Sequence, residues 1–220
     1  MDALQEDLFT DPTTNEVGGE SRKAKRIRVR DKVAHEEAVV LAAEVIDHLE
    51  GNFERAKVLG SILRGKKEVG DIEILLTPRF EGANFDAHEQ PTQWVNLHWA
   101  RVLDLIHQGV FAYRLDKNGQ RACGPKFQRL IYKDVGLDLF CQLAPAQWGV
   151  LQMIRTGSEQ FTRRCVTQRA KGGLLPNDMR VKDSQLWRGN AVDGWTLIPT
   201  PEEKDFFEVT GILYRRPEDR

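Results

Sequence analysis

The chain has no long hydrophobic run. No apolar stretch approaches the roughly eighteen residues that a membrane-spanning helix needs. The first residues, MDALQEDLFTD, are acidic, whereas a secretory signal begins with basic residues and continues with apolar ones. These absences predict a cytoplasmic protein with no membrane partner.

Cysteine is also scarce. The chain has three, Cys123, Cys141 and Cys165, which are widely spaced and form no CxxC pair. An odd, scattered set supports neither a disulfide framework nor a structural zinc site. We therefore expect small, buried, apolar side chains at these positions.

The chain lacks an excess of either charge, with a formal net charge of -1, so total charge does not favour polyanion binding. The charges are unevenly distributed, however. Residues 1–20 contain acids but no Lys or Arg, and residues 22–30 (RKAKRIRVR) are strongly basic. We expect a flexible tail over 1–30, whose basic run is either a solvated linker or a contact to a phosphate backbone.

A hydrophobic content of 40% is enough for a folded core, and the periodic segments predict an α+β fold. Val39, Ala42 and Ile46 recur at intervals of three or four and predict a helix over 31–49, with Asp31 as its N-cap. A second helix is predicted over 94–107. Strands are predicted, in chain order, over 55–60, 69–77, 110–115, 127–132 and 137–142.

The pattern changes after residue 144. Two helical stretches are separated at 156–158, and short strands follow at 179–181, 186–187 and 195–198. A last helix is predicted from Pro201, with Thr200 as its cap. We therefore predict a mixed-sheet domain over 31–144 and a smaller α+β domain over 145–220.

Two acids stand in an otherwise apolar strand, VGDIEILLT. Residues i and i+2 of a strand share a face about 6.7 Å apart, so Asp71 and Glu73 lie on one side of the strand. The pair is either an exposed acidic face or a site for divalent ions, which prefer hard oxygen ligands. Asp138, in the apolar run GLDLFCQ, is the candidate third carboxylate.

A glycine-serine turn precedes the acidic strand. Gly60 and Ser61 open a short helix whose amides and hydroxyl suit a phosphate, and Arg64 adds a cation. A phosphate site beside paired carboxylates is typical of phosphoryl or nucleotidyl transfer. Two metal ions then bridge the carboxylates, one activating the attacking hydroxyl and one neutralising the triphosphate.

The segment GSILRGKKEVGDIEIL resembles the GS-x-x-R-G-(basic)-x-x-x-G-D-[IM]-[DE] signature of the family X DNA polymerases, in the polymerase beta superfamily of nucleotidyltransferases. Three more segments resemble family motifs in the same order: VGLDLF, RTGSEQFTRR and PTPEEKDFFEVTGILYRRPEDR. The resemblance covers about residues 31–220. It implies a nucleotidyltransferase palm with a mixed β-sheet and flanking helices, followed by a small thumb or fingers domain.

The resemblance also implies residue roles. Asp71 and Glu73 would bind two Mg²⁺ ions, for which Mn²⁺ can substitute, and Asp138 would bind the catalytic ion and help to deprotonate the primer 3'-hydroxyl. The nucleotide-binding set would be Gly60, Ser61, Arg64, Gly70, Thr156, Gly157 and Thr162. The family's turn also contains a cis peptide, here between Gly157 and Ser158, and such a bond costs about 2.5 to 4 kcal/mol.

The chain departs from the family in three places. Glu73 replaces the usual second Asp, which affects metal spacing or Mn²⁺ preference, and Ile154-Arg155 replaces an aromatic pair. Thr162 replaces the Asn that contacts the incoming base, so the resemblance predicts no particular discrimination against ribonucleotides. About thirty residues precede the first palm helix, too few for a lyase domain, so we expect no lyase activity.

A basic cluster lies around the Thr-Gly-Ser turn. Its candidate DNA contacts are Arg155, Arg163, Arg164 and Lys171. The cluster is either a solvated surface or a contact to a DNA backbone, in place of a separate DNA-binding domain.

The leading hypothesis is a DNA-directed DNA polymerase that adds dNMP from dNTP to a primer terminus on gapped or primer-template DNA, in short-gap repair. It requires no protein partner. One alternative is a template-independent nucleotidyltransferase acting on a nucleic-acid 3' end or on a protein hydroxyl. Another is a non-catalytic nucleic-acid-binding module.

Overall fold

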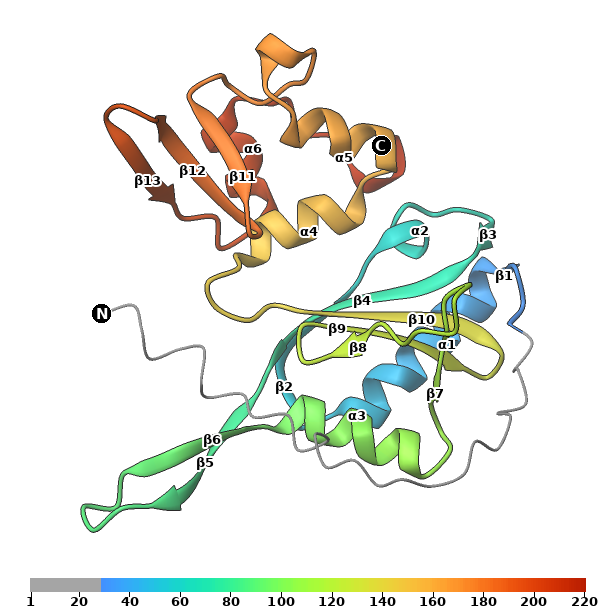
Figure 1. Cartoon of the computed structure of the whole chain (residues 1–220). Coiled ribbons are helices and arrows are strands. Elements are labelled where there is room, and N and C mark those ends of the chain that lie inside the picture. Colours follow the sequence, from blue (N-terminus) through green and yellow to red (C-terminus); the bar gives the residue numbers. More distant parts are fainter. Residues whose placement is uncertain (1–28) are drawn as a thin grey trace.

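The computed structural model describes residues 29–220, so the predicted acidic segment and most of the basic run of the tail lie outside the described residues. The fold is α+β, with a mixed sheet and six α-helices within those residues. In Figure 1 the sheet and the helices α1 and α3 form the lower part, and the segments from α4 onward lie above the sheet.

The central sheet has six strands. Its main order is β2-β4-β10-β9-β7, with bounds Phe53–Val58, Asp71–Pro78, Val135–Cys141, Phe127–Tyr132 and Ala112–Tyr113. The short β8, Cys123–Gly124, pairs with β9. Only β4 and β10 run parallel, and the other pairs are antiparallel. A parallel pair needs a long crossover, which here contains α3.

The two faces of the sheet have different coverings. Ile72, Ile74 and Leu76 of β4 belong to a core that also includes residues of α1 (His35–Leu49) and α3 (Leu97–His107). Because side chains alternate along a strand, Asp71, Glu73 and Leu75 occupy the opposite face. Leu75 packs there with Phe140, Trp148 and Leu151. The acids therefore share the face that meets α4.

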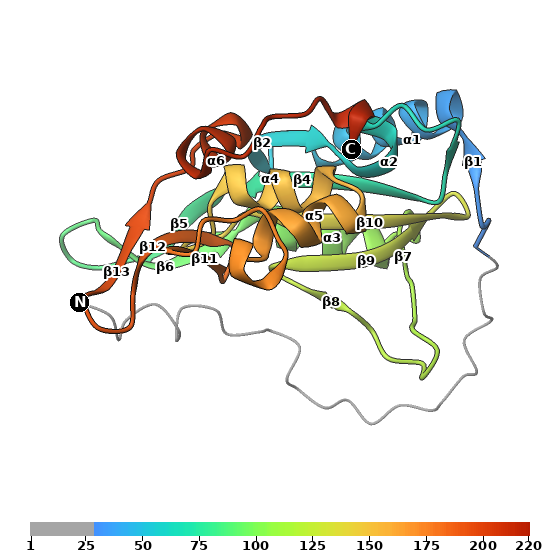
Figure 2. The ribbon, with the colours of Figure 1, turned by 90° about the horizontal axis from the view of Figure 1, so that it is seen from above.

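The C-terminal segment has its own core. Two helices, α4 (Trp148–Thr156) and α5 (Glu159–Val166), precede an antiparallel sheet of β11, β12 and β13. The bounds of these strands and of α6 are Met179–Lys182, Gln185–Asn190, Gly194–Ile198 and Glu203–Thr210. One apolar cluster extends from Val150 to Ile212, separate from the main core of Val33 to Leu143. Figure 2 shows α4 and α5 over the central sheet.

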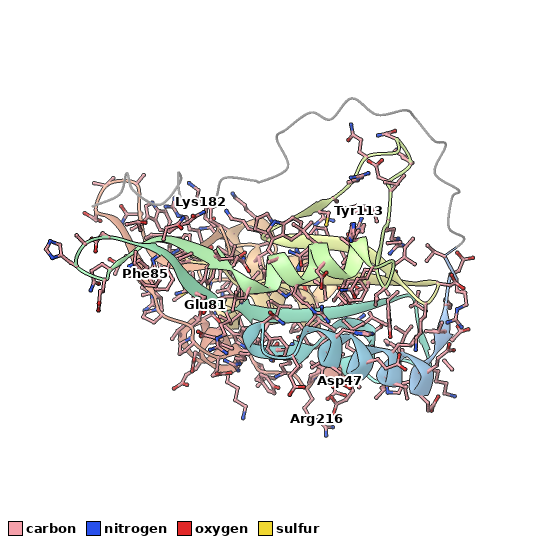
Figure 3. The ribbon with its side chains drawn as sticks, turned by 90° about the horizontal axis from the view of Figure 1, so that it is seen from below. Asp47, Glu81, Phe85, Tyr113, Lys182 and Arg216 are labelled. Atoms are coloured by element: carbon pink, nitrogen blue, oxygen red, sulfur yellow. The ribbon has the colours of Figure 1, made fainter. Side chains whose placement is uncertain are left out.

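Short elements complete the described chain. They are β1 (Val33–Ala34), α2 (Gly60–Leu63), β3 (Glu68–Val69), β5 (Phe80–Phe85), β6 (Pro91–Asn96) and the 3-10 turns Arg169–Lys171 and Pro217–Asp219. β5 and β6 form a hairpin that extends from the body, with Phe85 63% exposed (Figure 3). The hairpin was not predicted from the sequence.

The first two predicted helices begin later than expected. Helix α1 starts at His35, because Val33 and Ala34 pair with β3, so Asp31 is not its cap. Helix α3 starts at Leu97, where the Asn96 side chain accepts a hydrogen bond from the Trp99 amide at 2.9 Å. The prediction of a helix from residue 94 was wrong, since that segment is the end of β6.

The last helix and one strand also differ from their predictions. Helix α6 starts at Glu203, and Glu202 and Asp205 form a reciprocal capping box. Thr200 is not the cap, since its hydroxyl donates to the Gln147 side chain at 2.9 Å. The strand predicted over 110–115 is reduced to β7, because the amides of residues 110 and 111 bond to the Leu105 carbonyl at the end of α3.

Two of the three cysteines are buried, as the sequence predicts. Cys141 and Cys165 are buried and Cys123 is half-buried, and all three are free thiols. Across residues 29–220, no helix combines the length and the apolar character needed to cross a membrane.

Candidate active site

The parallel pairing of β4 with β10 brings the predicted carboxylates together. Asp138 lies directly opposite Glu73, and Gly136 lies opposite Asp71. Paired residues of neighbouring strands are about 4.8 Å apart and point to the same face. Asp138 is 5% exposed, whereas Asp71 and Glu73 are half-buried. Three acids therefore share one small area of the sheet face below α4.

The carboxylates affect one another. Burial raises the pKa of the Glu73 carboxyl to about 7, and the charge of Asp138 adds to this rise. The Arg64 and Arg155 guanidiniums lower the Glu73 pKa, and Asp71 raises it. Burial, more than charge, is therefore the reason why the Glu73 carboxyl holds its proton to nearly neutral pH.

Two arginines that the sequence did not single out bind the other acids. Arg114 forms an ion pair with Asp71 at 2.7 Å. Arg129 donates from Nε and Nη2 to the two oxygens of Asp138, at 3.2 and 3.1 Å, and this contact raises the Arg129 pKa. Within residues 29–220, no three Asp, Glu, His or Cys side chains already converge as a metal-binding group.

The position of Arg129 could have been predicted from the sequence. Lys133 and Asp134 form a two-residue turn with positive φ angles of 44° and 65°, which pairs Tyr132 with Val135. Counting back across this turn places Arg129 opposite Asp138, as observed. Arg114 gave no comparable signal, because its approach depends on the pairing of distant strands.

Two glycines leave space for the acids. A Cβ atom on Gly60 would lie 1.7 Å from Glu73 Oε2, and Gly60 has a φ of +61°. A Cβ atom on Gly136 would lie 2.2 Å from Asp71 Oδ1 and 2.4 Å from the Arg114 guanidinium. Gly60 and Gly136 therefore allow close approach of backbone to the acids, and Gly136 is a site residue that sequence reasoning missed.

The predicted glycine-serine turn is the start of α2. Gly60 is its first residue, and the preceding Leu59 amide donates to the Glu73 carbonyl at 2.8 Å. Ser61 and Gly70 are half-buried, and Gly70 directly precedes β4. The structure thus places this predicted phosphate segment beside Glu73.

Arg64 connects the central sheet to the C-terminal segment. Its Nη1 donates to the carbonyls of Thr156, at 2.9 Å, and Gly157, at 3.1 Å. Its buried Nε has no hydrogen-bond partner among the described residues. The Arg64 guanidinium therefore links the predicted nucleotide-binding residues near α2 to those at the end of α4.

The turn after α4 is compact. Thr156 is fully buried, and its hydroxyl has no partner among the described residues. A Cβ atom on Gly157 would lie 2.6 Å from the Thr162 hydroxyl, which itself donates to the Ile154 carbonyl at 3.1 Å. The expected cis peptide between Gly157 and Ser158 was wrong. The cis peptide of the described chain is Ala144-Pro145, and Ser158 instead caps α5 in an extended conformation.

The basic residues on either side of the turn do not form one surface. Arg155 lies 4.0 Å above the Phe140 ring, and its charge acts on Glu73 and Asp138. Arg163, Arg164 and Lys171 are exposed. The structure therefore places Arg155 at the carboxylate site and the other three on the outside.

The arrangement has the parts needed to hold a polyphosphate and divalent cations: clustered carboxylates, a glycine-led helix start and two nearby guanidiniums. Comparison with the models of known protein families finds no match for this chain. The functional interpretation therefore depends on this geometry and on the four sequence motifs.

Proposed function

We propose that the chain is a nucleotidyltransferase with a palm-like sheet, which adds dNMP from dNTP to a DNA 3'-hydroxyl. The observation that carries this proposal is the register of β4 and β10, which sets Asp138 opposite Glu73 and two residues from the level of Asp71. Three carboxylates on one sheet face, next to the start of α2, support a reaction that handles a triphosphate.

The residues present fit divalent cations. All three candidate ligands are carboxylates, the hard oxygen donors that Mg²⁺ prefers, and Mn²⁺ accepts the same ligands. The raised pKa of Glu73 comes first from burial and then from the charge of Asp138, and a bound cation would lower this pKa. Two bound ions would supply activation of the attacking hydroxyl and neutralisation of the triphosphate charge.

The chain's own residues hold the carboxylates in place, accept a proton and supply positive charge. Arg114 and Arg129 hold Asp71 and Asp138 in place before substrate arrives. Asp138, 5% exposed, is shielded from water and is the candidate to accept the proton of the 3'-hydroxyl at a carboxylate oxygen. Arg155 contributes positive charge on the side of α4.

The contact between the two segments favours a polymerase over a protein-modifying enzyme. Arg64 bonds to the Thr156 and Gly157 carbonyls, and Leu75 packs against Trp148 and Leu151. The C-terminal segment therefore covers the carboxylate face and can position a nascent base pair. Arg163 and Lys171, which follow the turn in the sequence, are exposed and could contact the phosphates of a DNA backbone.

Nucleotide incorporation tests the proposal. Purified chain is incubated with Mg²⁺ or Mn²⁺, labelled dNTPs or NTPs, and single-stranded, primed or gapped DNA. The proposal predicts metal-dependent extension that needs a template strand. Equal extension without a template would support the template-independent alternative, and DNA binding with no extension under any condition would support the non-catalytic one.

A further inference from the structure

One face of the C-terminal sheet lies outside the apolar cores of the described chain. Met179 and Leu186 belong to the core that includes α6, and side chains alternate along a strand. The register of β11, β12 and β13 therefore places five side chains on the opposite face, which we call the tryptophan face: Arg180, Lys182, Trp187, Trp195 and Leu197. None of the five belongs to a core cluster of residues 29–220.

Two indole rings and a guanidinium form the centre of the tryptophan face. Trp187 lies between Arg180 and Leu197 in the strand register. The Arg180 guanidinium lies 3.9 Å from the centroid of the Trp195 ring and 6.0 Å from that of Trp187. Leu197 is 40% exposed, and both tryptophans are half-buried. Flat π surfaces are therefore partly open to solvent.

The charge of the tryptophan face is positive. All residues of β11, β12 and β13 are described, and none of them is Asp or Glu. Among residues 29–220, neither Arg180 nor Lys182 makes a side-chain hydrogen bond or ion pair. Lys182 is exposed at the surface (Figure 3). The face is therefore complementary in charge to an anionic ligand.

Two hydrogen-bond donors on this face have no acceptor. Arg180 Nε and Trp187 Nε1 are buried without a partner among the described residues. A buried donor without a partner costs free energy, and an oxygen atom of a ligand held against the face would accept from it. The tryptophan face therefore lacks acceptors as well as negative charge.

We propose that the tryptophan face binds an unpaired stretch of a DNA strand. Unpaired bases stack on aromatic rings and on guanidinium planes, and their phosphates bind nearby cations. The phosphate and base oxygens also supply the missing acceptors. A duplex keeps its bases stacked inside and would leave the two indole rings without a partner. Rings and cations side by side on one face therefore favour single-stranded over double-stranded DNA.

The tryptophan face is connected to the candidate active site through α4. The Gln147 amide, just before α4, donates to the Ser184 carbonyl at 2.9 Å, and the Leu186 amide donates to the Gln147 side chain at 2.9 Å. At the other end of α4, the Thr156 carbonyl accepts from Arg64. Helix α4 has nine residues, so its ends lie about 12 Å apart at 1.5 Å per residue. A DNA molecule held at the carboxylates is therefore long enough to reach the face.

The bound strand is the template. This step rests on the proposed function, in which the primer 3'-hydroxyl lies at the carboxylates and the template continues unpaired beyond it. In gapped or primer-template DNA, no other strand is unpaired next to the primer end. The face would therefore favour DNA with an unpaired template over a blunt duplex.

Binding of duplexes with and without an unpaired template tests the proposal. Fluorescence anisotropy, at fixed salt and without metal or dNTP, compares a blunt duplex with the same duplex carrying a 5' overhang of about eight thymidines. We expect wild type to bind the overhang duplex at least about tenfold more tightly, and Trp195→Leu to prefer it by less than about twofold. The control Trp94→Leu, which changes an exposed tryptophan of β6, should keep the full preference. Circular dichroism checks the folding of each variant.

Lys182→Ala is a second variant, which changes an exposed side chain and leaves both rings in place. For single-stranded oligo-dT, the slope of log affinity against log salt should become shallower by about 0.7, the value for one phosphate contact. An unchanged slope would overturn the proposal. Equal wild-type affinities for the two duplexes would overturn it too, and so would an overhang preference that survives in Trp195→Leu.

Two further measurements identify the occupant. Polyglutamate at the same charge concentration should leave labelled oligo-dT bound, and displacement would show a site for any polyanion, which overturns the proposal. Sedimentation velocity should give the same monomer for wild type and Trp195→Leu. A dimer that Trp195→Leu dissociates would assign the face to a second copy of the chain and overturn the proposal. Because none of these assays needs catalysis, failure of nucleotide incorporation leaves their results readable.

Discussion

Replacing Glu73 with glutamine should stabilise the metal-free protein at neutral and alkaline pH. The folded pKa of Glu73 is about 7, against 4.5 for the free side chain. The folded state therefore binds this proton more tightly, so the stability contributed by protonated Glu73 is fully present below about pH 4.5. It is lost as pH rises towards 7. Glutamine keeps the shape of the side chain but carries no charge to bury.

The size of the effect follows from the two pKa values. Raising the pKa from 4.5 to about 7 corresponds to about 3 kcal/mol, at about 1.4 kcal/mol for each pH unit. Glu73→Gln and wild type should therefore unfold with equal free energies near pH 4. At pH 8 the variant should be more stable by about 3 kcal/mol.

Urea denaturation in EDTA, followed by circular dichroism between pH 4 and 8, measures this difference. The control is Glu54→Gln, an exposed carboxylate on the neighbouring β2, which should change stability by less than about 0.5 kcal/mol at every pH. Adding Mg²⁺ should stabilise wild type more than Glu73→Gln, which lacks one of the three candidate ligands. A stability difference that does not vary with pH, or a variant less stable than wild type at pH 8, would refute the reasoning.

Three further predictions concern the same site. Gly60→Ala should lose nucleotide incorporation and more than about 1 kcal/mol of stability, because its Cβ would meet the Glu73 carboxylate. The matched variant Gly51→Ala, also at positive φ but with open space, should cost only about 1 kcal/mol and keep activity, so equal effects would contradict the contact. Arg64→Met should raise KM for dNTP and lower Tm by several degrees, since two carbonyls lose their donor, and unchanged values in a melting and kinetic assay would argue against the link. Arg155→Met should raise the Glu73 pKa further, seen by NMR titration, and a lowered or constant pKa would remove Arg155 from the site.

Local patterns were enough for most elements of the fold. Strand β9 has the predicted bounds, Phe127–Tyr132, because its apolar residues and flanking turns are local signals. Segment ends were less predictable. Residues 94–96 continue the helical periodicity of α3 but pair with β5 instead, and only the distant strand decides between the two.

In the site, too, positions within one strand were predictable, whereas contacts between strands distant in sequence were not. Alternation along one strand was enough to place Asp71 and Glu73 on a common face. Arg114, the ion-pair partner of Asp71, follows β7 directly and became visible only with the strand order. The expected contact of Arg155 with DNA similarly depended on its membership of a basic cluster in the sequence, without the position of Phe140 beneath it.

Incorporation of dNMP by the Asp138→Asn variant tests the central claim most directly. The assay is single-turnover primer extension with Mg²⁺ on a gapped duplex, with folding checked by circular dichroism. Metal coordination contributes several kcal/mol of transition-state stabilisation, so we expect the rate to fall on the order of 10³-fold. The control Asp47→Asn, an exposed acid on α1 (Figure 3), should stay within about twofold of wild type. Extension by Asp138→Asn at the wild-type rate would contradict the assignment of this carboxylate cluster as the catalytic site.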